Sequence, residues 1–393
     1  MKKNVALVGL GQRGNGWAKH FLGRSDTDLI AVSDVYPDRV EQIRKLAAEQ
    51  GRDTIRYAVG DYRALLDKKD IDVVIIATSW EDHVNTAIDF MRAGIATAME
   101  VGGAYDLSDC HRLVQAYEAT GTPFFFMENC CYGKRETMVR NMAQLGVLGE
   151  IVHCAGSYSH DLREEIVTGI EKRHYRFRNY RLRNCDNYPT HDLGPISKIL
   201  NLGRGNRMVS LVSVASKSVG LETYMAKKHP EMEPVRFLQS DVINTVITCS
   251  GGETILLTLD TALPRSYSRS FRVRGTEGMY DEDTDSIYLD SEHTPKYEYD
   301  LKPLWGNAKD YEEKYLPEIW KQDINTNVVH GGMDELMIND FFRCLNEGLP
   351  MPIDVYDAAS WMAVSALSEE SIRRSGAPVS FPDFTGGRWM LQV

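Results

Sequence analysis

A glycine-rich run that follows an apolar strand pattern and opens a helical pattern constrains the fold of this chain more than any other feature. The run consists of Gly9, Leu10, Gly11, Gln12, Arg13 and Gly14. Glycines at this spacing allow a tight turn and let the backbone approach a pyrophosphate, which the free N–H groups of the following helix can bind. The strand before it and the helix after it favour a dinucleotide-binding loop over a glycine turn without a ligand.

Asp34 ends the second predicted strand, 20 positions beyond Gly14. A carboxylate at this place accepts hydrogen bonds from the adenosine ribose and repels a 2′-phosphate, so the predicted cofactor is NAD rather than NADP. Arg39 could pair with such a phosphate, but its position on the next predicted helix favours a solvated side chain.

Strand and helix patterns alternate over roughly the first 125 residues, which predicts a parallel sheet covered on both faces. Strands without regular crossover helices follow from residue 151. We therefore predict an α/β protein with an N-terminal Rossmann domain over 1–128. Over 129–393 we predict an α+β domain with an open, mostly antiparallel sheet for substrate binding and oligomerisation, although its last helices could pack back on the first domain. An open sheet with one uncovered face favours a homo-oligomer, either a dimer or a tetramer.

The charge balance excludes several classes of partner. The 393 residues include 45 Lys and Arg against 56 Asp and Glu, for a formal net charge of -11. This balance argues against nucleic acid and against an anionic membrane surface. No apolar run approaches the ~20 residues that span a bilayer. The apolar run Val5–Val8 is too short for a signal peptide, so we expect a cytoplasmic protein unless a targeting peptide has been removed.

The seven cysteines are an odd number, and none stands in a Cys-x-x-Cys pair. Reduced, buried thiols in a reducing compartment are the prediction. No Cys, His and carboxylate set stands at metal-ligand spacing in the sequence, so no metal is predicted. The sequence has no Gly-x-Ser-x-Gly elbow to support serine hydrolase chemistry either.

The buried strand Asp72–Thr78, the helix that opens near His83 and the strand that ends at Glu100 carry a family resemblance. They resemble the Gfo/Idh/MocA family of nicotinamide-dependent sugar enzymes. The resemblance covers nearly the whole chain and implies a Rossmann domain followed by an open-sheet domain.

Longer runs carry a closer resemblance. They are 79–83, 100–101, 127–133, Tyr158 with 160–161, 180–182, 188–191, 193–195, 264–268 and 330–332. These runs resemble glycoside hydrolase family 109, a branch of NAD-dependent α-N-acetylgalactosaminidases that act in carbohydrate metabolism. Ordinary glycosidases use a pair of carboxylic acids, and the NAD-dependent families are exceptions.

The resemblance implies a redox-neutral cycle on a small-molecule glycoside with a terminal sugar or N-acetylamino sugar. The sugar is oxidised transiently at C3, a base removes the acidified C2 proton, the C1 substituent is eliminated, water adds and C3 is reduced again. The implied catalytic residues are Tyr158, Tyr188 and His191, any of which could be the C2 base. The implied substrate contacts are Tyr158, His160, Arg181, Tyr188, His191, Tyr267 and His330. The implied cofactor contacts are Gly9, Gly11, Gln12, Arg13, Gly14, Asp34, Trp80, His83, Glu100, Val101 and Asn129.

Two positions depart from the simple dehydrogenases of the Gfo/Idh/MocA family. Val101 stands where they have lysine, and Asn187 stands where an aspartate precedes His191 by four residues. We therefore predict an NAD-dependent glycosidase and keep an NAD-dependent sugar dehydrogenase as the alternative. A non-catalytic NAD-binding sensor is a third reading, but it would not need Tyr158, Tyr188 and His191 together.

Two further features depart from the hydrolase family itself. The segment 172–183 is unusually basic, and Asp192 stands where that family is expected to have glycine. The cations of the basic segment either lower the pKa of a nearby tyrosine or form a solvated charged face. These departures leave the sugar, its anomer and the aglycone open.

Overall fold

The computed structural model describes residues 2–292, 300–321, 324–326 and 329–391. The chain divides into two compact units, one of residues 1–127 and 339–360, the other of residues 128–338 and 361–393. The predicted domain boundary after residue 128 stays a prediction. Among the described residues, none of the helices is long and apolar enough to cross a membrane.

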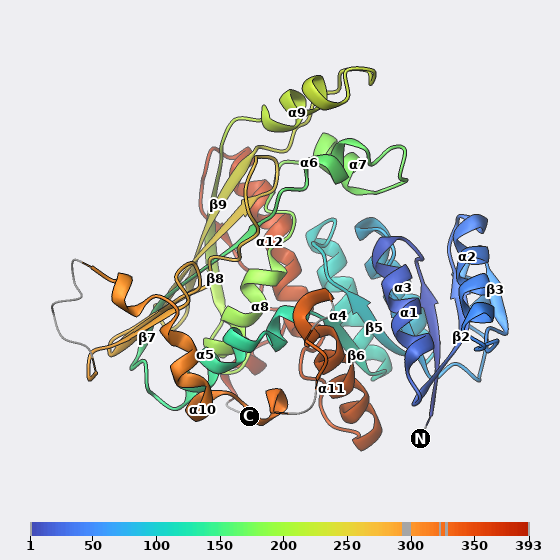
Figure 1. The fold of residues 1–393 in the computed structure, drawn as a ribbon, viewed down its shortest axis with the longest axis horizontal. Coiled ribbons are helices and arrows are strands. Elements are labelled where there is room, and N and C mark those ends of the chain that lie inside the picture. The colour runs from blue at the N-terminus through green and yellow to red at the C-terminus, as the bar shows by residue number, and fades with distance from the viewer. Residues whose placement is uncertain (1, 293–299, 322–323, 327–328, 392–393) are drawn as a thin grey trace. The chain divides into compact units, whose positions relative to one another are not determined.

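The first unit is built on a six-stranded sheet in the order β3-β2-β1-β4-β5-β6 (Figure 1). The strands are β1 (Lys3–Val8), β2 (Thr27–Ser33), β3 (Tyr57–Val59), β4 (Val73–Ile76), β5 (Ala96–Glu100) and β6 (Phe124–Met127). Every neighbouring pair is parallel. The helices of its first part are α1 (Gln12–Gly23), α2 (Pro37–Glu49), α3 (Trp80–Arg92) and α4 (Leu107–Thr120). Since β4 is a run of fully buried Val and Ile, this sheet is covered on both faces, which confirms the Rossmann prediction.

A late segment of the chain completes the first unit. It holds the last part of α11 (Met333–Glu347) and the first part of α12 (Val355–Arg373). Phe341 of α11 stacks on Phe125 of β6 with ring centroids 5.0 Å apart. The N–H of Phe126 donates to the carbonyl of Ile353 at 3.1 Å. The apolar edge strand β6 is therefore covered by residues more than 200 positions later in the chain.

The second unit is built on an eight-stranded sheet in the order β13-β12-β11-β7-β10-β9-β8-β14. The strands are β7 (Ile151–Ser159), β8 (Met208–Ala215), β9 (Val242–Cys249), β10 (Thr254–Asp260), β11 (Arg272–Gly275), β12 (Gly278–Asp281), β13 (Ser286–Leu289) and β14 (Val379–Ser380). Neighbours are antiparallel except β7 and β10, which are parallel. This arrangement confirms the prediction of an open, mostly antiparallel sheet.

One face of this sheet is packed and the other is open in the single chain. The remaining helices are α5 (Lys134–Gln144), α6 (Arg163–Val167), α7 (Arg176–Leu182), α8 (Thr190–Ile199), α9 (Gly220–Lys228) and α10 (Glu312–Tyr315). Helix α8 packs against β7 on the face to which Gly156 and Tyr158 point. On the other face, Val214 and Val246 are each about half exposed.

Candidate functional site

The loop between β1 and α1 has the shape that an anion requires. Gly9 has φ +88°, and a Cβ there would lie 2.4 Å from the carbonyl oxygen of Ala77. Gly11 is the N-cap of α1 and makes no side-chain hydrogen bond to the first N–H groups of the helix. This close backbone turn with uncapped donors fits the pyrophosphate of a dinucleotide.

Asp34 connects the glycine loop to the end of β2. The side chain is buried, its Oδ2 accepts the N–H of Leu10 at 2.7 Å, and its Oδ1 accepts the N–H of Tyr36 at 2.9 Å. Each carboxylate oxygen keeps a further lone pair for a ribose hydroxyl. Arg39 differs from the expected solvated side chain, because its guanidinium lies 3.5 Å from Asp34 and over the ring of Tyr36.

Further predicted cofactor residues of the first unit lie in α1, in α3 and at the end of β5. Oε1 of Glu100 accepts Nε–H of Arg13 at 2.5 Å and the indole N–H of Trp17 at 2.6 Å, so it anchors α1 to the end of β5. Val101, which follows Glu100 in the sequence, is buried. Trp80, the first residue of α3, is buried as well. His83 contacts the carbonyl of Thr78 at 3.0 Å, and burial lowers the pKa of its imidazole to about 4. Their roles toward a cofactor stay predictions.

The three predicted catalytic residues lie together in the second unit. The ring centroids of Tyr158 and Tyr188 are 4.4 Å apart, and His191 lies 5.6 Å from Tyr158 and 4.9 Å from Tyr188. Tyr158 comes from β7, whereas Tyr188 and His191 flank the start of α8, which packs on that strand. The packing of one helix start on one strand therefore assembles two phenols and one imidazole.

Two more predicted residues extend this cluster. The ring of His160 lies 6.1 Å from Tyr158 and 5.3 Å from Tyr267. Tyr267 is 53% exposed, whereas Tyr158 and Tyr188 are buried. The five rings therefore form a row from the interior to the surface, as a site that admits a small molecule requires.

Glu128 is a site residue that the sequence analysis missed. Its side chain is fully buried, and its Oε1 lies 2.7 Å from Nδ1 of His191. Burial alone would raise the pKa of this carboxyl, but His191 and the backbone N–H of Cys130 hold it below its usual value. Since an ionised carboxylate only accepts hydrogen bonds, His191 donates its Nδ1–H and keeps Nε2 as an acceptor.

Arg176 is a second site residue that was missed. It is the buried member of the basic segment, and its guanidinium lies 5.2 Å from the ring centroid of Tyr188 and 3.2 Å from Glu165. Burial raises the pKa of Tyr158, and the charge and hydrogen bond of Arg176 act in the opposite direction. The pKa of Tyr158 is raised on balance, so this one cation of the basic segment offsets only part of the effect of burial, and Arg178 and Arg181 are exposed.

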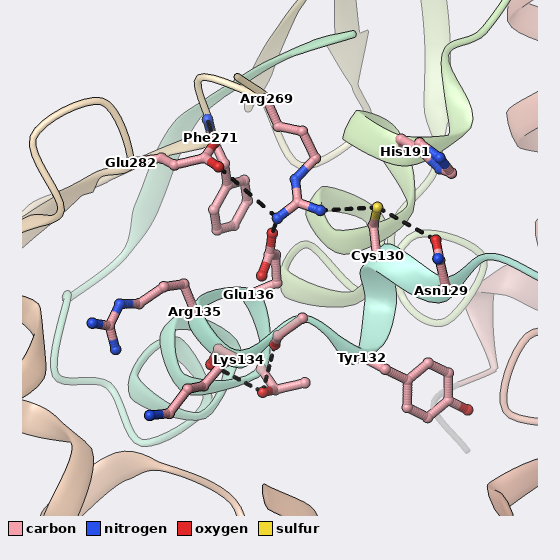
Figure 2. A network of polar contacts seen from close by, with 12 residues as sticks. Asn129, Cys130, Tyr132, Lys134, Arg135, Glu136, His191, Arg269, Phe271 and Glu282 are labelled. Carbon is pink, nitrogen blue, oxygen red and sulfur yellow. Dashed lines mark hydrogen bonds and ion pairs between the residues drawn. The ribbon is translucent and has the colours of Figure 1, made fainter. Parts of the chain in front are cut away.

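A second cation, whose side chain is 13% exposed, contacts Cys130. Arg269 donates from Nη1 to Sγ of Cys130 at 3.0 Å, and its Nη2 pairs with Glu136 and lies 3.9 Å from Glu282. Figure 2 shows this guanidinium between Cys130 on one side and the two carboxylates on the other, with His191 on the Cys130 side. Burial raises the pKa of the Cys130 thiol well above its usual value, against the opposing charge of Arg269.

Three predicted residues lie outside the ring cluster. The guanidinium of Arg181 lies over Phe177 on the surface of α7. Asn129 donates from Nδ2 to Oδ1 of Asp334 at 2.8 Å, and Nδ1 of His330 lies 2.9 Å from Oδ2 of the same aspartate. Asp334 therefore links Asn129, which follows Glu128, to His330, whose backbone has φ +62°.

Each half of the chain matches a known protein family. Residues 3–127 match the family described as "Oxidoreductase family, NAD-binding Rossmann fold", and residues 132–391 match "Glycosyl hydrolase 109, C-terminal domain". A glycosyl hydrolase family 109 protein of Stenotrophomonas maltophilia is 35% identical over 99% of this chain and 90% of its own length. An alpha-N-acetylgalactosaminidase of Tannerella forsythia is 33% identical over 98% of this chain and 86% of its own. The first unit is thus an NAD-binding domain, as predicted.

A solved structure of lower sequence identity has a similar fold. A levoglucosan dehydrogenase solved with NADH has a TM-score of 0.72 to this structure at 17% identity, over 98% of this chain and all of that one. This likeness confirms the predicted fold.

Proposed function

The chain belongs to glycosyl hydrolase family 109, and from this premise we propose that it is an NAD-dependent glycosidase for a small-molecule glycoside. A terminal sugar or N-acetylamino sugar is the proposed substrate. One relative is named an alpha-N-acetylgalactosaminidase, which makes N-acetylgalactosamine the first sugar to test.

One observation carries the proposal: Tyr158, Tyr188 and His191 form a close group backed by a buried carboxylate. When bound, NAD⁺ supplies a reversible oxidation of the sugar at C3, which acidifies the proton on C2. His191 is suited to take that proton at Nε2, because its Nδ1 is held by Glu128.

The two phenols serve the other proton transfers. A tyrosine that donates its proton to the departing C1 oxygen becomes a phenolate, and Arg176 lies beside both phenols to stabilise that charge. The same phenolate can take a proton from the water that later adds at C1. The group therefore offers one base and two weak acids, without the carboxylic acid pair of ordinary glycosidases.

A sugar dehydrogenase of the same fold is the second candidate, favoured by the likeness to levoglucosan dehydrogenase. Val101 argues against it, because a buried valine has no group that could take a proton from a substrate hydroxyl. A dehydrogenase would also accumulate NADH, whereas the proposed cycle leaves the cofactor unchanged.

Nitrophenyl glycosides of both anomers separate these two functions. The purified protein is incubated with a panel that includes N-acetylgalactosaminide, and both nitrophenol and NADH are followed. The proposal expects nitrophenol release without net NADH. Accumulation of NADH in proportion to substrate, with no nitrophenol from any glycoside, would establish the dehydrogenase instead.

Proton exchange tests the elimination step. Product formed in D₂O should carry deuterium at C2, because the proposed base removes that proton during each turnover. Hydrolysis that leaves C2 fully protiated would exclude the elimination route and indicate direct displacement at C1.

A cytoplasmic homo-oligomer is part of the proposal. The seven cysteines are free thiols, which suits a reducing compartment. The open face of the eight-stranded sheet carries Val214 and Val246, which suits a second copy of the chain. Sedimentation of the purified protein distinguishes a dimer or tetramer from a monomer.

A further inference from the structure

Three side chains that could bind a metal ion lie close together, and one of them, His191, also belongs to the cluster of five aromatic rings described above. Glu128, Cys130 and His191 each offer one ligand atom, and these three atoms all lie within 4.8 Å of one another. We propose that this Glu128–Cys130–His191 group binds a thiophilic divalent cation such as Zn²⁺, and that the ion inhibits the enzyme by occupying His191. The inhibitory part rests on the proposed function, whereas the binding part does not.

The three donors match what zinc requires. Zinc binds thiolate, imidazole and carboxylate together, and a site with three protein ligands keeps a fourth position for water. Metal–ligand distances of about 2.0–2.3 Å place neighbouring ligand atoms some 3–4 Å apart in a tetrahedral site. The observed separations, all within 4.8 Å, are close to this spacing, and the three side chains draw together by about 1 Å as the ion binds.

Two short elements hold these donors. Glu128 is the N-cap of the one-turn helix Asn129–Tyr132, and its Oε1 accepts the N–H of Cys130 at 3.1 Å. His191 lies in the first turn of α8. Glu128 and Cys130 are buried, while the side chain of His191 is 15% exposed, which leaves an approach for an ion at the imidazole.

The charges around the site balance an ion of charge +2. Binding releases the thiol proton to solvent, so the thiolate of Cys130 and the carboxylate of Glu128 together neutralise the cation. Arg269 already donates to Sγ of Cys130 and is itself paired with Glu136 (Figure 2). That hydrogen bond can remain on a ligating sulfur and stabilise it, since Sγ has further lone pairs.

Binding would stop proton transfer at the imidazole. Coordination at Nε2 occupies the nitrogen that takes the C2 proton, and coordination at Nδ1 leaves the ring proton on Nε2, so in either case Nε2 can no longer act as the base. The carboxylate that orients the ring is drawn to the same ion. Inhibition by Zn²⁺ and its reversal by a chelator follow.

Cobalt is the probe for binding, because Co²⁺ takes zinc sites and its bond to thiolate gives a near-ultraviolet charge-transfer band. Titration of the full chain with Co²⁺ should give this band at about one equivalent. The variant Cys130→Ser should lose the band and bind about 100-fold more weakly or worse, since even the loss of a ligand's outer partner costs 10–100-fold. The matched control is Cys131→Ser, which removes the neighbouring thiol and should keep the band.

The outcomes separate the site from the function. A band that survives in Cys130→Ser, or that is lost in Cys131→Ser instead, overturns the site. If Cys130→Ser does not fold, His191→Ala provides the same test and should weaken Co²⁺ binding with the same lower limit. In the activity arm, Zn²⁺ should inhibit the parent and Cys131→Ser but not Cys130→Ser, each relative to its own rate. Binding with no inhibition of an active enzyme overturns the inhibitory part, and absence of glycosidase activity leaves the cobalt result standing.

Discussion

The carboxylate of Glu128 lies 2.7 Å from Nδ1 of His191, and neither residue is near the other in the sequence. Glu128 follows β6 and is fully buried, while His191 lies 63 residues later in α8. A buried carboxylate in this place fixes the orientation and the tautomer of the imidazole. The pair therefore prepares one nitrogen, Nε2, to accept a proton.

Replacement of Glu128 by glutamine tests this pair. The amide keeps the shape but removes the negative charge beside the proton-accepting ring, so Glu128→Gln should lower kcat by about 10²-fold or more. Glu282→Gln, which removes a carboxylate near Arg269 instead, is the control. Equal losses in both variants would assign Glu128 a structural role.

The phenol of Tyr188 and the imidazole of His191 are the groups that should matter most for turnover. Removal of a proton-transfer group costs about 10²–10⁴-fold in rate, so Tyr188→Phe and His191→Ala should each lower kcat within that range. NAD binding should stay near normal, because the glycine loop of the first unit is unchanged. If both variants hydrolyse substrate at the parent rate, the chemistry lies elsewhere, at Tyr158, Tyr267 or His330.

The carboxylate of Asp34 should contribute to the affinity of the protein for NAD. Asp34→Ala removes the ribose acceptor and also releases the N–H groups of Leu10 and Tyr36, so NAD should bind at least about tenfold more weakly. Titration calorimetry of the parent and the variant measures this change. The guanidinium of Arg39 lies 3.5 Å from Asp34, where it could pair with a 2′-phosphate. The preference of the parent between NAD and NADP therefore also tests the role of Asp34. Tighter binding of NADP than NAD by the parent would contradict the role given to Asp34.

The fold could be predicted from the sequence because its signals are local. The glycine loop, the spacing to Asp34 and the apolar strand β4 each lie within one strand–helix unit. The membership of Tyr158, Tyr188 and His191 in one site came from the family resemblance. Periodicity and composition alone do not bring β7 and α8 together.

Three features of the site could not be predicted from the sequence, and each has a physical reason. They are the roles of Glu128 and Arg176 and the pairing of Arg39 with Asp34. Glu128 is one carboxylate in a short apolar stretch, and its partner is 63 residues away. Arg176 is one cation among several in its segment, and only its burial distinguishes it. Arg39 turns toward Asp34 because its guanidinium also lies over Tyr36, a contact that helix spacing does not indicate.

Asp186 should make stability depend on pH. Burial raises the pKa of this carboxyl to about 7 in the folded chain, against an ordinary value near 4 when unfolded. A raised acid pKa means that stability is full below the unfolded pKa and falls as pH rises toward the folded one. In the isosteric variant Asp186→Asn, which has no carboxyl to titrate at this position, this fall in stability with rising pH should be absent. From pH 5 to pH 8 its free energy of unfolding should therefore gain about 2–3 kcal/mol relative to the parent. Urea unfolding curves that shift in parallel with pH in both proteins would contradict the assignment.

The contact between β7 and α8, which assembles the ring cluster, can be tested at Gly156. A Cβ on Gly156 would lie 2.8 Å from Cβ of Asp192, so Gly156→Ala should push the helix from the strand and cost about 1–3 kcal/mol of unfolding free energy. Gly16→Ala is the matched control, because nothing lies within 4 Å of its new Cβ in α1. It should instead stabilise the chain by about 0.5–1 kcal/mol.

A second substitution shows whether this contact is the cause. Asp192→Gly removes the opposing Cβ, so Gly156→Ala in that background should cost at least about 1 kcal/mol less than in the parent. Urea unfolding of the four proteins gives this coupling energy, and kcat should recover with it if the strand–helix contact positions Tyr158 against His191. Equal costs of Gly156→Ala in both backgrounds would show that α8 and β7 do not meet at these two residues.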